Sequence, residues 1–221
     1  MNVSDALERR KSTRAFLDKQ VEPELISQIL KSASHAPSGT NTQPWQVAVV
    51  SGHSKGLLEQ ELELAFRDGE ENRMDYQYYP LQWDSPYKDR RRACGLQMYS
   101  TLDIKREDKQ KQHSQWAQNY HGFSAPVILF FFIDPVLQTG SYIDYGMFLQ
   151  SVMLAATEQG LATCPQAALA EYPDIVKRHL SYPHDSILLC GMALGYEDKE
   201  ALVNSYRTPR EPFDRFTQFF D

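Results

Sequence analysis

The sequence predicts an α+β domain in which helices flank a single sheet, and three observations support this fold class. Helical and strand periodicities alternate along the 221 residues without an internal repeat. Residues 127–133 are apolar without a break, which is typical of a strand buried on both faces. Residues 142–159 follow a helical pattern that is apolar nearly all round, so that helix should be buried on all sides, either in a thick core or in a subunit interface. We therefore expect one continuous domain over residues 1–221.

Two helices are expected before the first strand. Ser4 can cap a short helix that runs through Arg9. Pro23 suits the first turn of a second helix, whose apolar residues form one stripe. This second helix should end near Pro37, because the residue before a proline avoids the helical region of backbone conformation.

Four strands and two further helices complete the expected domain. Runs of β-branched and apolar residues predict strands at 46–50, 127–133, 161–164 and 186–194. Gly160 suits a left-handed cap after the apolar helix, and a short helix is expected around residues 172–180. The polar, helix-forming residues at about 55–120 are interpreted as a helical excursion over the sheet.

Composition and charge argue against several classes of function. The formal net charge is -6 and there is no long basic run, so nucleic acid is not an expected partner. The apolar runs are too short to cross a bilayer and the N-terminus has no signal pattern, so we expect a soluble, cytoplasmic protein. Three widely spaced cysteines predict no disulfide framework, and we expect each to be buried. The six histidines show no metal-ligand spacing, so no metal site is expected.

A dense cationic segment follows the first helix: Arg9-Arg-Lys-Ser-Thr-Arg14. In extended backbone, Arg10, Ser12 and Arg14 point to the same side. Such an arrangement suits a phosphate and a second anionic point on the same ligand. The alternative is a solvated basic helix end, which the helix dipole favours.

A second candidate segment is the loop at residues 36–45, Ala-Pro-Ser-Gly-Thr-Asn-Thr-Gln-Pro-Trp. Loops that are dense in amide and hydroxyl groups can bind the edge of a planar heterocycle. The alternative is an ordinary connection with Trp45 in the core.

These two motifs, separated by one amphipathic helix, resemble the opening of the nitroreductase family, flavoenzymes that fold as intertwined dimers around two FMN molecules. The likeness continues through residues 160–168, 190–196 and 208–212. Residues 79–92 and 144–150 look most similar to the nitrobenzoate reductase branch. The resemblance implies a three-layer α/β/α fold with a mixed central sheet. It also implies a homodimer in which the C-terminal arm reaches the partner.

The resemblance also implies roles for individual residues. Arg10 and Arg210 would hold the FMN phosphate, and Lys11 and Ser12 would contact the phosphate or the ribityl chain. Arg14 would lie near flavin N1 and O2, where a fixed guanidinium favours the reduced anion. Residues expected at the flavin ring, partly from the neighbouring subunit, are Pro37, Ser38, Gly39 and Asn41. Residues expected beside flavin N5 are Pro165, Gln166, Ala167 and Ala168.

Two positions depart from the family pattern. Family members often carry Glu-Gly where this chain has Ala167-Ala168, which leaves a backbone donor but removes a side-chain role. Thr208 stands where some members have a second cation, so the phosphate would depend more on Arg10 and Arg210.

The tail at residues 204–221 mixes arginines with four phenylalanines. A free tail of this composition would expose too much aromatic surface, so we expect it to wrap a partner subunit.

Substrate residues are expected in the helical excursion. Arg90, Arg91 and Arg92 could clamp a substrate carboxylate. Three consecutive arginines on a helix cannot share one face, so at least one of them is expected to be solvated. Tyr79, with Tyr78 and Trp83, could line an aromatic pocket, and core packing is the alternative.

The implied activity is a ping-pong cycle in which NAD(P)H reduces FMN and a nitroaromatic or quinone is then reduced at flavin N5. No glycine-rich dinucleotide fingerprint follows a strand, so the nicotinamide would visit the flavin site itself. Two alternatives remain open: reductive dehalogenation or other specialised flavin chemistry on the same fold, and a non-catalytic flavin-binding protein.

Overall fold

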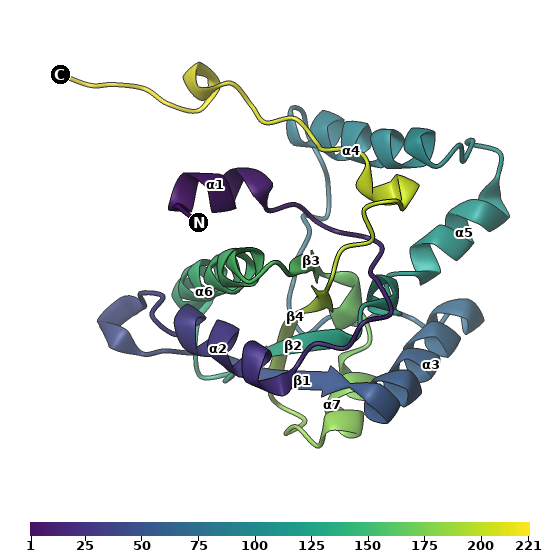
Figure 1. The fold of residues 1–221 in the computed structure, drawn as a ribbon, viewed down its shortest axis with the longest axis horizontal. Helices are drawn as coiled ribbons and strands as arrows, with labels where there is room; N and C mark the ends of the chain where they lie inside the picture. The colour runs from purple at the N-terminus through teal and green to yellow at the C-terminus, as the bar shows by residue number, and fades with distance from the viewer.

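A four-stranded sheet lies between two layers of helices in the computed structural model, which describes residues 1–221 (Figure 1). One face carries α2 (Pro23–Ala33) and α6 (Thr139–Glu158), and the other carries α3 (Gly52–Asp68) and α7 (Pro173–Leu180). Short 3₁₀ helices at Gly39–Asn41, Gly122–Ser124, Ala168–Ala170, Leu202–Asn204 and Phe213–Arg215 lie in the connections. The predicted three-layer α+β fold is therefore confirmed.

The sheet has the order β1-β2-β4-β3, with strands β1 (Gln46–Ser51), β2 (Val127–Ile133), β3 (Ala162–Gln166) and β4 (Ile187–Gly195). All four strands pair antiparallel, whereas a mixed sheet was expected. The difference arises because β4 lies between β2 and β3 and runs opposite to both. The one parallel pairing is the isolated bridge between Ser12 and Thr163. Because β3 is an edge strand, Pro165 is tolerated within it.

The core follows from the alternation of side chains along β2. All seven residues of this strand are buried, as the unbroken apolar run predicted. Its odd-numbered residues, such as Leu129 and Phe131, pack toward α2 and α6. Its even-numbered residues, such as Phe130, pack toward α3 and α7. The central strand therefore supplies both hydrophobic cores of the domain.

Helix α6 buries one side only within the single chain, so of the two expected ways of burying it, a thick core and a subunit interface, the chain itself does not supply the first. Phe148 and Val152 are almost fully buried against the sheet. Ile143 and Met147 on the opposite side are 70% and 37% exposed. Gly160 adopts the predicted left-handed conformation after the helix, with φ +74°. The helix thus presents an apolar outer face to its surroundings.

The first helix, α1 (Val3–Arg9), is capped by a different residue from the one expected. The Oδ1 atom of Asn2 accepts a hydrogen bond of 2.8 Å from the backbone N of Asp5. Ser4, the expected cap, lies inside the helix. The second helix begins at Pro23 as predicted.

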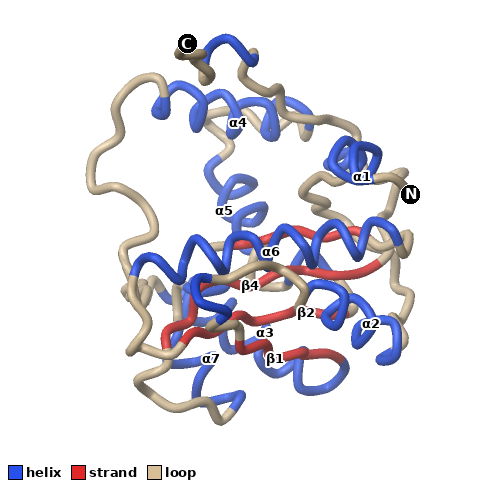
Figure 2. The backbone as a smooth tube through the Cα atoms, turned by 90° about the vertical axis from the view of Figure 1, so that its left-hand side faces the viewer, coloured by secondary structure: helices blue, strands red, loops and turns tan.

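Helices α4 (Tyr87–Thr101) and α5 (Lys109–Ala117) stand away from the sheet, and the C-terminal tail extends past α4 (Figure 1; Figure 2). No residue of α4 is buried. Phenylalanines 213, 216, 219 and 220 in the tail are all exposed. None of the helices combines the length and hydropathy needed to span a membrane.

Candidate functional site

A cationic cavity lies where the segment after α1 meets the beginning of the C-terminal tail. Its volume is about 140 Å³. The lining residues are Arg10, Lys11, Ser12, Arg14, Cys94, Tyr206, Arg207, Thr208 and Arg210. No carboxylate lines it. Burial, followed by the positive charges of Arg210 and Arg207, lowers the pKa of Arg10. Such a concentration of guanidinium groups is suited to binding an anion.

The N-terminal side of the cavity is fixed to the edge of the sheet. Ser12 pairs with Thr163 of β3, and the backbone N of Thr13 donates to the carbonyl of Thr163 at 3.0 Å. Arg10, Ser12 and Arg14 all line the cavity from this extended segment, as predicted. Lys11 also lines it, but its Nζ atom forms an ion pair of 2.7 Å with Glu197. Lys11 is therefore partly neutralised within the chain.

Asn204 connects this segment to the tail, and sequence reasoning missed it. Its side-chain Oδ1 accepts from the backbone N of Arg14 at 2.8 Å. Its Nδ2 donates to the carbonyls of Ala15 and Asp198 at 2.9 and 2.8 Å. Its own carbonyl accepts from Lys11 Nζ at 2.5 Å. Because Asn204 is buried, these bonds hold the position of the arginine motif without direct contact with solvent.

Arg207 is a second residue that sequence reasoning missed. Its Nη2 atom donates to the carbonyls of Arg9 and Arg10 at 3.1 and 2.6 Å. Arg207 therefore adds a guanidinium to the cavity, which the neutral side chain of Thr208 cannot provide. Thr208 itself accepts from Arg210 Nη1 at 3.1 Å through its hydroxyl. The sequence does show Arg207 three residues before Arg210. An irregular tail has no periodicity, however, so this spacing does not predict where either side chain points.

The edge strand β3 lies beside this segment and carries unpartnered polar atoms. Thr163 Oγ1 and Gln166 Oε1 are buried without a hydrogen-bond partner. Gln166 is otherwise held by a bond of 2.9 Å from its Nε2 to the carbonyl of Asn119. Cys164 is buried, and burial raises its pKa to about 11. The predicted stretch Pro165–Ala168 runs on from these residues along β3 and into the 3₁₀ turn that follows.

The proline-flanked loop does not reach the cavity within one chain. Pro37, Ser38, Gly39 and Asn41 are absent from its lining. The loop instead lies near α6, where a Cβ atom on Gly39 would be 3.7 Å from Asp144 Oδ2. In Figure 1 the connection between α2 and β1 lies on the left of the molecule, whereas α4 lies at the upper right, and the tail runs past α4 to the upper left. One chain therefore assembles only part of the predicted site.

The residues expected to contact substrate gather at the start of α4. Arg90 Nη2 forms an ion pair of 3.2 Å with Glu211. The guanidinium of Arg91 lies over the rings of Trp83 and Tyr79, at 5.3 and 6.0 Å from their centroids. Aromatic residues at these positions thus form a surface cluster with one stacked arginine.

The three cysteines differ in environment, and the expectation that each is buried is wrong for Cys94. Cys164 and Cys190 are buried, but Cys94 is exposed and lines the cationic cavity. Its exposure follows from the position of α4, whose residues are all at least partly accessible.

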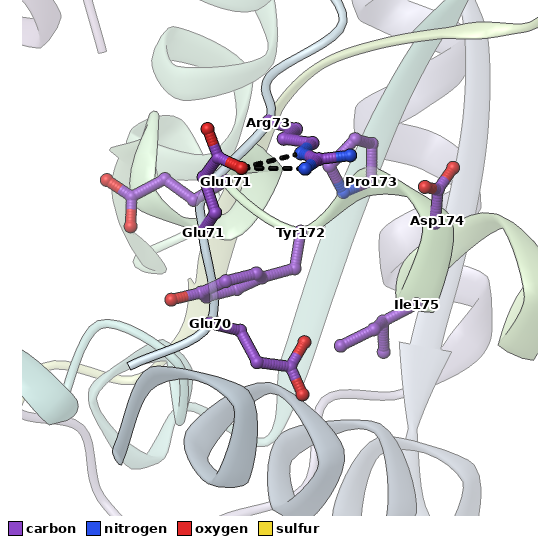
Figure 3. A pocket seen from close by; sticks show the side chains of 8 residues that line it. All are labelled: Glu70, Glu71, Arg73, Glu171, Tyr172, Pro173, Asp174 and Ile175. Carbon is purple, nitrogen blue, oxygen red and sulfur yellow. Dashed lines mark hydrogen bonds and ion pairs between the residues drawn. The ribbon is translucent and has the colours of Figure 1, made fainter. Parts of the chain in front are cut away.

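A second cavity, of about 330 Å³, has the opposite charge (Figure 3). It is lined by Glu70, Glu71, Arg73, Glu171, Tyr172, Pro173, Asp174 and Ile175. Its one arginine, Arg73, forms an ion pair of 2.7 Å with Glu71. No three His, Cys, Asp or Glu side chains are arranged to hold a metal ion. This cavity would repel a phosphate, so the cationic cavity is the better candidate.

The chain is similar to known proteins over most of its length. The model of the Nitroreductase family matches residues 7–196. A 4-nitrobenzoate reductase of Pseudomonas putida is 38% identical over 210 residues, which cover 95% of this chain and 92% of that protein. An iodotyrosine dehalogenase 1 homolog of Caenorhabditis elegans is more distant, with 26% identity over 98% of this chain and 60% of that protein.

Two solved structures are similar over the whole of both chains. The FMN- and NADPH-dependent nitroreductase from Sphigopyxis sp. strain HMH is 39% identical, with a TM-score of 0.97. The FMN-dependent nitroreductase from Mycobacterium smegmatis, solved in complex with NADPH, is 32% identical, with a TM-score of 0.93.

Proposed function

Because the chain belongs to the nitroreductase family, we propose that it is an FMN-dependent oxidoreductase that uses NAD(P)H to reduce small nitroaromatic or quinone-like molecules. The cationic cavity is the observation that carries this proposal. It gathers four arginines from two distant parts of the chain, without a carboxylate among its lining residues. An anionic group must be supplied by a ligand, and the phosphate of FMN meets that requirement.

The donor set of the cavity fits FMN. In our assignment, Arg10, Arg207 and Arg210 bind the phosphate, and Lys11 and Ser12 contact the phosphate or the ribityl chain. The unpartnered polar atoms of Thr163 and Gln166 on neighbouring β3 support a polar ligand beside that strand. The chemistry that FMN supplies when bound is two-electron transfer between the nicotinamide and the acceptor.

Arg14 has a different role in this proposal from the phosphate-binding arginines. We assign it to the pyrimidine edge of the ring, where negative charge increases on reduction. Its backbone N is fixed by Asn204, and its Nη1 donates to the carbonyl of Ser12 at 3.3 Å. A guanidinium held in advance stabilises that charge without reorganisation.

The stretch that follows Cys164 lies beside flavin N5 in our assignment and also covers one face of the ring. Pro165, Gln166, Ala167 and Ala168 belong to β3 and the turn after it, which are packed on the core. Reductant and acceptor must then use the other face in turn, which gives a ping-pong cycle and favours planar substrates. Tyr79, Arg90 and Arg91 are the residues of this chain that we assign to the substrate. Arg90 contributes less because Glu211 already engages it.

A homodimer is part of the proposal. The ring-binding loop with Pro37, Ser38, Gly39 and Asn41 lies apart from the cavity of its own chain, so a second copy would complete the site. The exposed apolar side of α6 and the exposed phenylalanines of the tail provide surface for such a partner. We propose that residues 1–221 act as one FMN-binding domain. Use of NAD(P)H and three free cysteines support a cytoplasmic location.

An anaerobic assay with NADPH and NADH tests the activity. The purified protein should bleach on adding a reduced nicotinamide and regain its colour on adding 4-nitrobenzoate or a quinone. Halide release from a halogenated phenol, without loss of the nitro group from 4-nitrobenzoate, would favour the dehalogenase alternative. Bound FMN that neither nicotinamide reduces would overturn the proposed activity in favour of a flavin-binding protein.

A further inference from the structure

The three consecutive arginines at the start of α4 have different partners. Arg90 is ion-paired with Glu211 at 3.2 Å. Arg91 stacks over Trp83 and Tyr79. Arg92 forms neither an ion pair nor an aromatic contact. Successive residues on a helix point about 100° apart, so the three side chains cannot act as one group. Of the three, only Arg91 is held by neighbouring side chains while its positive charge remains unpaired.

The stacking of Arg91 leaves its hydrogen-bonding edge free. A guanidinium that lies over an aromatic ring uses its face, and its N–H groups remain in the plane. Arg91 forms no ion pair with any carboxylate of the chain. A stacked arginine of this kind is oriented in advance for a bidentate pair with an external carboxylate.

Helix α4 places Arg91 close to the proposed flavin site. Cys94 lines the cationic cavity. Arg91 precedes Cys94 by three residues, so the two side chains share a face of the helix and are separated by one turn. Tyr79 lies near both: burial raises its pKa, Arg91 opposes that rise, and Glu171 and Cys94 add to it. Arg91 therefore lies one helical turn from a residue that lines the cationic cavity.

The rings beside Arg91 offer faces on which an aromatic molecule can stack. Tyr78 and Tyr79 are 46% and 47% exposed, which is high for rings that pack against each other. Their centroids are 4.5 Å apart with an interplanar angle of 84°, and Trp83 lies 5.7 Å from Tyr79. This cluster is anchored to the domain through Tyr76, whose hydroxyl donates to the carbonyl of Leu189 at 2.8 Å. Exposed rings beside a free guanidinium match both parts of an aromatic acid.

We propose that Arg91, held by Trp83 and Tyr79, is the subsite that recognises the carboxylate of an aromatic acid. This inference rests on the proposed function and narrows its substrates to nitroaromatic acids. Arg92 does not take part in the recognition, and Arg90 contributes less than Arg91 because Glu211 engages it. Arg91 is a specificity residue, which binds the end of the substrate remote from the nitro group.

A pair of substrates that differ in charge tests this subsite. 4-Nitrobenzoate and 4-nitrobenzamide have the same ring and nitro group, but only the first is an anion. In the FMN-loaded enzyme, Arg91→Gln should lower kcat/KM for 4-nitrobenzoate by about 10- to 100-fold, the range for losing a hydrogen-bonded charge pair. The value for 4-nitrobenzamide should change by less than about twofold. Arg92→Gln, the matched control, should leave both values unchanged. Equal losses for both substrates, or no loss, would overturn the proposal.

Binding of benzoate provides a readout that does not depend on turnover. Calorimetric titration of the FMN-loaded wild type should show benzoate binding more tightly than benzamide, and Arg91→Gln should remove the difference. Arg91→Lys should recover only part of it, because lysine lacks the planar fork. Equal affinities in the wild type, or no benzoate binding at millimolar concentration, would refute the subsite. If the wild type reduces 4-nitrobenzamide but Arg91→Gln binds benzoate as tightly as the wild type does, the subsite is refuted and the proposed function stands. If the wild type reduces neither of these compounds nor a quinone, the proposed function fails, and benzoate binding still decides the subsite.

Discussion

At the scale of single residues, the geometry of the site depends on polar side chains that bond to the backbone of distant segments. Asn204 is 4% exposed and joins the arginine motif to the tail through both side-chain groups and its carbonyl. Arg207 adds two bonds to the backbone of the same motif. Both residues are more than half the chain away in sequence from the motif whose position they fix. Their removal should therefore affect ligand binding as well as folding.

Substitution of Asn204 tests this connection. Asn204→Ala removes its bonds to Arg14, Ala15 and Asp198 and leaves buried groups unpaired. The free energy of unfolding should fall by about 2–4 kcal/mol. FMN affinity should fall by at least about tenfold, because the arginine motif and the tail that carry the proposed phosphate ligands are no longer joined. Ser205→Ala, which removes an exposed hydroxyl bond, should change neither quantity. A loss of stability with unchanged FMN affinity would contradict the positioning role.

The arginine assigned to the flavin ring and those assigned to the phosphate should differ in which measured property their substitution changes. Arg14→Ala should lower the reduction potential of the bound flavin more than it weakens FMN retention, because it removes charge at the ring in our assignment. Arg210→Ala should mainly weaken retention, because it removes a phosphate ligand. Potentiometric titration and FMN dissociation constants of both variants measure the split. Equal effects of the two substitutions on both quantities would contradict the division of roles.

At the scale of elements, the sheet holds β3 beside the arginine motif, and packing beneath it leaves little tolerance. Gly191 of β4 pairs with Gln166 of β3. A Cβ atom there would lie 2.7 Å from Leu169 Cβ and 2.5 Å from its Cδ1. Because Leu169 is fully buried, it cannot move aside freely.

Glycine-to-alanine substitutions at two positions test this packing. Gly191→Ala should lower the free energy of unfolding by about 1–3 kcal/mol through overpacking. Gly56→Ala, in the interior of α3 with no atom within 4 Å of the added Cβ, should raise it by about 0.5–1 kcal/mol. Urea denaturation of both variants measures the contrast. A neutral Gly191→Ala variant would show that β3 and its turn are less tightly packed than described.

The connection between β3 and α7 also carries a pH-dependent group. Tyr120 donates a hydrogen bond to Glu171 Oε2. Burial raises the pKa of Glu171 above its usual value of 4.5, although the bond from Tyr120 opposes the rise. The folded state therefore binds more protons than the unfolded state between 4.5 and the raised pKa. Stability from this group is present below 4.5 and is lost as the pH rises through that interval.

Replacing Glu171 removes this dependence. Glu171→Gln keeps an acceptor for Tyr120 but cannot ionise, so the variant should be more stable than the wild type at pH 7 and equally stable at pH 4. Denaturation midpoints at both pH values measure the difference. Glu70→Gln, which changes an exposed carboxylate of the same acidic cavity, is the matched control. Equal stability of Glu171→Gln and wild type at pH 7 would contradict the assignment.

At the scale of the whole molecule, local patterns predicted the elements better than they predicted the site. The ends of β2 agree with the prediction because an apolar run bounded by Pro126 and Asp134 is a local signal. Asn2 and Ser4 are both competent caps, so sequence alone did not choose between them. Arg10, Ser12 and Arg14 were found because they alternate along one extended segment.

The rest of the site depends on distant parts of the chain. The bonds of Asn204 to Arg14 and of Arg207 to Arg10 span about 190 residues or more, and no periodicity reveals them. The apolar outer face of α6 could not be interpreted from local sequence either, because nothing in the same chain covers its apolar side chains. The same holds for the loop at 37–41, which does not line the cavity of its own chain and which, in our proposal, completes the site of a second subunit.

The central claim is that the cationic cavity holds the phosphate of FMN, and calorimetric titration of the apoprotein with FMN and riboflavin tests it most directly. The two ligands share the ring and the ribityl chain and differ only in the phosphate. One FMN should bind per chain, at least about 100-fold more tightly than riboflavin, because several charge-assisted hydrogen bonds are lost with the phosphate. Equal affinity for the two ligands, or failure to bind FMN, would contradict it.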